Sequence, residues 1–63
     1  MNDEDYKTLE AMDKYGGSFV QSLASLARQA DPINLQKIKA TWPDYWVQYH
    51  QMAKEDEKIK EQT

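Results

Sequence analysis

The chain contains no cysteine and few of the residues that interrupt helices. Its 63 residues include two glycines and two prolines. The lack of cysteine excludes disulfides and thiolate metal sites, and the scarcity of glycine and proline favours helices over a turn-rich β fold. A single core below roughly 70–80 residues rarely supplies more than about 3–5 kcal/mol. We therefore expect self-association to supplement the core, most simply as a homodimer.

Long apolar runs and a basic excess are also missing. No stretch approaches the ~20 residues of a membrane span. The start, Met1-Asn2-Asp3-Glu4-Asp5, has neither the basic residues nor the apolar run of a signal peptide. We expect a cytoplasmic protein without membrane contact. The net charge is −3, so the basic footprint of a nucleic-acid-binding domain is absent.

Apolar residues instead recur at helical spacing between clear stop signals. Residues 3–15 place Tyr6, Leu9 and Met12 three apart. Gly16-Gly17 predicts the end of this helix, because glycine accepts the left-handed conformation found at helix C-termini. Ser18 and Gln21 have the spacing of a capping box at the start of the next helix. The inner stripe of that helix is predicted to hold Phe19, Val20, Leu23, Leu26, Ala27 and Ala30.

Asp31-Pro32 predicts the start of a third helix, with Asp31 as its N-cap. Pro43 ends that helix and begins a fourth, which runs to about Lys60. Leu35, Ile38 and Trp42 are predicted to face inward from the third helix. We predict an all-α fold, a compact array of three to four short helices that forms one domain over residues 1–63. Residues 1–4 and 55–63 are expected to fray or to be solvated.

An aromatic cluster at the third joint is the first candidate site. It holds Trp42, Tyr45, Trp46 and Tyr49 within eight residues. Two tryptophans are a natural filling for a small helical core, and Trp and Tyr also dominate binding hot spots. The sequence leaves both interpretations open. We predict a partner-binding or self-association role for part of the cluster.

The turn between the first two helices is the second candidate site. It consists of Lys14, Tyr15, Gly16, Gly17 and Ser18. Backbone amides at a helix N-terminus can bind an anion, so a phosphate-bearing nucleotide is an alternative ligand. The plainer interpretation is a helix–helix joint, because glycine-rich nucleotide loops carry more glycines and follow a strand.

No catalytic motif and no metal site is predicted. His50 is the sole histidine, and no nucleophile stands in a recognisable motif. No cofactor is expected, and we predict that the chain is not an enzyme. The acidic runs Asp3-Glu4-Asp5 and Glu55-Asp56-Glu57 would suit a mimic of a phosphate backbone, but the small net charge favours solvated ends. A helix-turn-helix around Asp31-Pro32 is a further alternative, weakened by the few basic residues there.

Three short runs carry a resemblance to known proteins: Lys14-Tyr15-Gly16-Gly17-Ser18-Phe19-Val20, Ala30-Asp31-Pro32, and Trp42-Pro43-Asp44-Tyr45-Trp46 with Tyr49. In these runs the chain resembles short accessory proteins encoded by bacteriophages and prophages, over residues 6–53. The resemblance implies a viral protein in a bacterial cytoplasm that acts against host defences. Our leading hypothesis is a homodimer that binds and inhibits a host protein or protein complex. The alternatives are a sponge for a nucleotide signal and a DNA-binding regulator.

Overall fold

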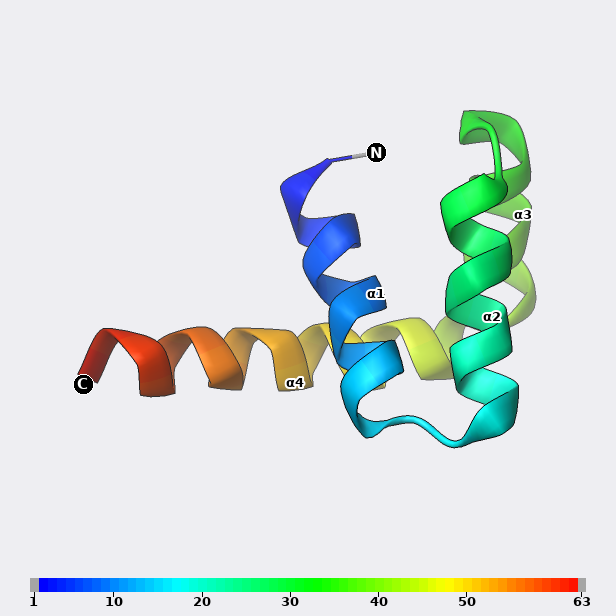
Figure 1. The fold of residues 1–63 in the computed structure, drawn as a ribbon. Helices are drawn as coiled ribbons and strands as arrows, with labels where there is room; N and C mark the ends of the chain where they lie inside the picture. Colours follow the sequence, from blue (N-terminus) through cyan, green and yellow to red (C-terminus); the bar gives the residue numbers. More distant parts are fainter. Residues whose placement is uncertain (1, 63) are drawn as a thin grey trace.

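The computed structural model describes the backbone of residues 2–62 and the side chains of residues 2–58. These described residues form four helices: α1 (Asp3–Tyr15), α2 (Ser18–Gln29), α3 (Pro32–Thr41) and α4 (Pro43–Gln62) (Figure 1). The predicted all-α array of short helices is confirmed. Within the described part of the chain, none of the helices has the length and apolar character that a membrane span needs.

Side chains cap the starts of α1 and α3. Asn2 Oδ1 accepts a hydrogen bond from the backbone N–H of Asp5 at 2.8 Å, and Asp31 Oδ1 accepts one from the N–H of Asn34 at 2.7 Å. The predicted Asp31 cap is therefore confirmed, with Pro32 as the first helical residue. Each cap satisfies an amide that has no partner within its own helix.

The start of α2 differs from the prediction. Gly17 is the N-cap, no side chain caps this helix end, and Ser18 is already the first helical residue. The predicted capping box is therefore wrong. The side-chain amide of Gln21 instead donates to the backbone carbonyls of Asp13 at 3.3 Å and Gly16 at 3.1 Å. Gln21 thus satisfies carbonyls at the end of α1 and joins the two helices.

The left-handed turn predicted at the glycines is also wrong. The backbone φ is −82° at Gly16 and −76° at Gly17, which any residue can adopt. Gly16 is required for a different reason. A Cβ at Gly16 would lie 2.5 Å from Val20 Cγ1 and 2.6 Å from the carbonyl oxygen of Met12, whereas a Cβ at Gly17 would meet nothing within 4 Å. Position 16 needs a glycine because α1 and α2 approach each other so closely there that a Cβ atom would clash.

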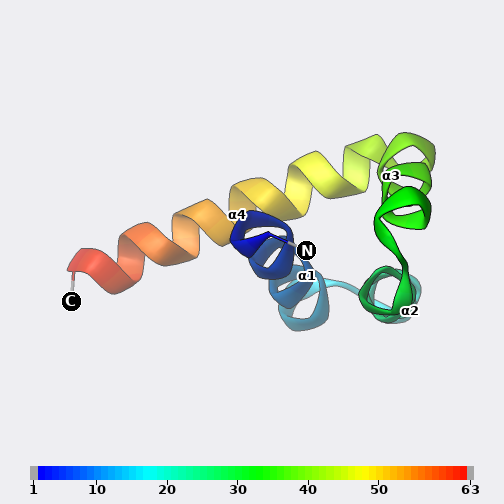
Figure 2. The ribbon, with the colours of Figure 1, turned by 90° about the horizontal axis from the view of Figure 1, so that it is seen from above.

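The first three helices run in alternating directions, and α4 crosses them (Figure 1). Seen from above, α1 lies against the middle of α4 and α3 lies at the N-terminal end of α4, while α2 lies beside α3 and away from α4 (Figure 2). The last turns of α4 extend beyond α1. The core between the helices consists of Leu9, Ala11, Met12, Val20, Leu23, Ala24, Ala27, Leu35, Ile38 and Tyr49.

The apolar stripes predicted for α1 and α2 are only partly right. Tyr6 is 54% exposed, and Phe19 and Leu26 on α2 are 56% and 52% exposed. The buried face of α2 instead consists of Val20, Leu23, Ala24 and Ala27. The apolar stripe of α2 is wider than the area that its neighbours cover, so one edge of it remains at the surface. This exposed edge forms part of the candidate site.

Candidate functional site

The four aromatic residues of the predicted partner-binding cluster do not share one environment. Tyr49 is buried in the core, and Trp46 is half-buried, with Lys39 Nζ 5.2 Å from the centroid of its ring. Trp42 and Tyr45 are half-buried at the joint between α3 and α4. Tyr49 therefore belongs to the core, and Trp42 and Tyr45 are the members that lie beside an exposed surface.

Phe19 completes this surface from α2. Its ring centroid lies 6.2 Å from that of Trp42, in an edge-to-face arrangement, and 5.9 Å from that of Tyr45. We call Phe19, Trp42 and Tyr45 the aromatic corner. Sequence reasoning placed Phe19 in the core and missed it as a surface residue. A signal was present, because Phe19 and Leu26 stand seven residues apart and so share one edge of α2.

A groove between α2 and α3 continues from the aromatic corner. It has a volume of about 470 Å³. A smaller hollow of about 170 Å³, lined by Phe19, Ser22, Leu23, Leu26 and Trp42, shares Leu26 and Trp42 with it. We call the larger hollow the α2–α3 groove; its lining residues are Leu26, Gln29, Ala30, Asn34, Lys37, Ile38, Thr41 and Trp42. Of these residues, the sequence indicated Trp42 as part of the aromatic cluster, and Asn34 and Lys37 only as part of the polar face of a helix-turn-helix.

The predicted ligand-binding turn is occupied by contacts within the chain. The Tyr15 hydroxyl donates to the carboxylate of Asp56 on α4, at 2.7 and 2.8 Å from its two oxygens, and Lys14 Nζ lies 3.5 Å from Asp56 Oδ2. A hydrogen bond with Tyr15 and the charge of Asp56 raise the pKa of Lys14. Gly16, Gly17 and Ser18 form the joint itself. A phosphate bound here would have to compete with the Asp56 carboxylate.

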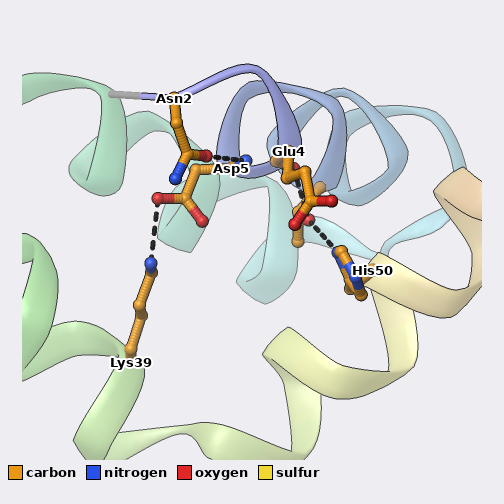
Figure 3. A network of polar contacts seen from close by, with 6 residues as sticks. Asn2, Glu4, Asp5, Lys39 and His50 are labelled. Carbon is orange, nitrogen blue, oxygen red and sulfur yellow. Dashed lines mark hydrogen bonds and ion pairs between the residues drawn. The ribbon is translucent and has the colours of Figure 1, made fainter.

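A polar network holds α1 against α3 and α4 (Figure 3). Lys39 Nζ contacts Asp5 Oδ2 at 2.8 Å, and both side chains are largely buried. The hydroxyl of Thr8 lies 2.9 Å from the carbonyl oxygen of Glu4 and 3.2 Å from His50 Nδ1. A carbonyl oxygen only accepts, so the hydroxyl donates to Glu4 and accepts from the Nδ1–H of His50.

This bonding pattern makes His50 a structural residue that links α4 to the fully buried Thr8 of α1. Neither His50 nor the Asp5–Lys39 pair lines the α2–α3 groove. Among the residues that the structure describes, no group of three or more histidine, aspartate or glutamate side chains is placed to hold a metal ion.

Two further ion pairs join α1 to its neighbours. Lys7 Nζ contacts Glu57 Oε1 on α4, and Arg28 Nη2 on α2 contacts Asp13 Oδ2. The hydrogen bond to Glu57 raises the pKa of Lys7, and the hydrogen bond to Asp13 raises the pKa of Arg28. Asp56 and Glu57 thus contact α1, although they fall in the segment expected to be solvated. The side chains of residues 59–63 lie outside the described residues, so fraying there stays a prediction.

The arrangement of α2 and α3 differs from that of a helix-turn-helix. The two helices run side by side in nearly opposite directions (Figures 1 and 2). In a DNA-reading helix-turn-helix they meet at about 90–120°, which frees the second helix to enter the major groove. Asn34 and Lys37 line the α2–α3 groove together with α2 residues. This geometry gives no support to the DNA-binding alternative.

Comparison with protein families, curated proteins and solved structures finds no match to this chain.

Proposed function

We propose that the chain is a small non-enzymatic accessory protein of the phage type, which binds and inhibits a host protein in the bacterial cytoplasm. The observation that carries the binding part is the aromatic corner together with the adjoining α2–α3 groove, whose lining combines four apolar residues with four polar ones. Contiguous exposed apolar surface on a small domain marks interaction sites. Trp and Tyr at such a surface supply rigid contact area that dominates binding energy.

Two of the exposed large hydrophobic residues lie at this surface, while Ile33 on α3 and Val47 on α4 are exposed outside it. Phe19 and Leu26 are more than half exposed, while Leu23 between them is 4% exposed. Their side chains adjoin a hollow, so a convex partner side chain would gain contacts on several sides at once. Two parts of the proposal come from the resemblance to phage accessory proteins: that the partner is a protein of a bacterial host, and that binding inhibits it.

The experiment is affinity capture from a bacterial lysate with three forms of the tagged chain. The wild type is expected to retain a defined protein, and Leu26→Glu is expected to lose it. Val47→Glu is the matched control, because Val47 is 66% exposed but lies on α4 outside the groove. Retention by Leu26→Glu equal to that by the wild type would contradict the proposal, as would loss of the partner in both variants.

A further inference from the structure

We draw no further inference here: the strongest candidate, the exposed edge of α2 with the aromatic corner and the adjoining α2–α3 groove, belongs to the site already described, and nothing in the structure shows what covers it.

Discussion

At the scale of single residues, Gly16 shows how a close helix contact constrains the sequence. Its backbone conformation is open to any residue, yet a side chain there would overlap Val20 and the backbone of α1. The neighbouring Gly17 has no such contact. The two glycines are adjacent in sequence and differ only in what surrounds them, so they form a matched pair for experiment.

Gly16→Ala is expected to lower the free energy of unfolding by about 1–3 kcal/mol, because the added methyl group forces Val20 or the helix joint to shift. Gly17→Ala is expected to change it by less than about 1 kcal/mol, since alanine restricts the unfolded chain but is a poorer N-cap than glycine. Urea denaturation of both variants measures the difference. Equal effects of the two substitutions would show that the α1–α2 contact is looser than described.

Lys14 and Tyr15 test the nucleotide alternative. Both side chains already contact the Asp56 carboxylate, so a phosphate must displace an internal anion. We expect that nucleotides at millimolar concentration do not raise the melting temperature of the protein. A rise that is lost in Lys14→Glu would instead support a nucleotide sponge and would contradict this account of the turn.

At the scale of helices, local sequence signals predict where each helix begins and ends. They do not predict which face of a helix is buried. Asp31-Pro32 and Pro43 act on their own backbone, so the sequence predicts the starts of α3 and α4 correctly. Which edge of α2 is covered depends on how α1 and α3 pack against it. Periodicity identifies a stripe that includes Phe19 and Leu26, but it carries no information about the width of the neighbouring surface.

For the same reason, the sequence does not predict the contacts between helices. Tyr15 and Asp56 are 41 residues apart, and Asp5 and Lys39 are 34 apart. No local pattern pairs these residues, because their meeting depends on the crossing of whole helices. The α2–α3 groove is also a product of packing, and of its lining residues the sequence indicated only Trp42 as part of a protein-binding site.

The Asp5–Lys39 pair gives a prediction at this scale, since it joins α1 to α3. Asp5 is 8% exposed, so Lys39→Met leaves a carboxylate with poor access to water. We expect the free energy of unfolding to fall by about 1–3 kcal/mol. Lys37→Met on the same helix is the control and should change it by less than about 0.5 kcal/mol. Indistinguishable denaturation midpoints for the two variants would be evidence against the structural role of the pair.

At the scale of the whole molecule, a small core is combined with an open apolar surface. The buried apolar residues are few and include several alanines, as expected of a chain this short. Phe19 of the aromatic corner and Leu26 of the groove are two of the exposed large apolar side chains, and they share one edge of α2; Ile33 and Val47 are exposed outside this edge. This separation of a closed core from an open edge is what supports a binding role.

Self-association is the remaining prediction for the whole molecule. We expect a homodimer, because a core of this size is marginal without a supplement. Light scattering should give about twice the 7.4 kDa mass of one chain. The mass of Leu26→Glu should equal that of the wild type, since the groove is assigned to another partner. A measured mass of a single chain would contradict the dimer and leave the groove assignment intact.

Site-specific photo-crosslinking shows whether the partner binds at the α2–α3 groove. Gln29 lines the groove, and Gln48 is an exposed glutamine on α4 that does not. A photo-reactive residue at position 29 is expected to give one dominant adduct with a protein of the bacterial lysate, and the same residue at position 48 none. Equal adducts from both positions, or an adduct from position 48 alone, would contradict the account.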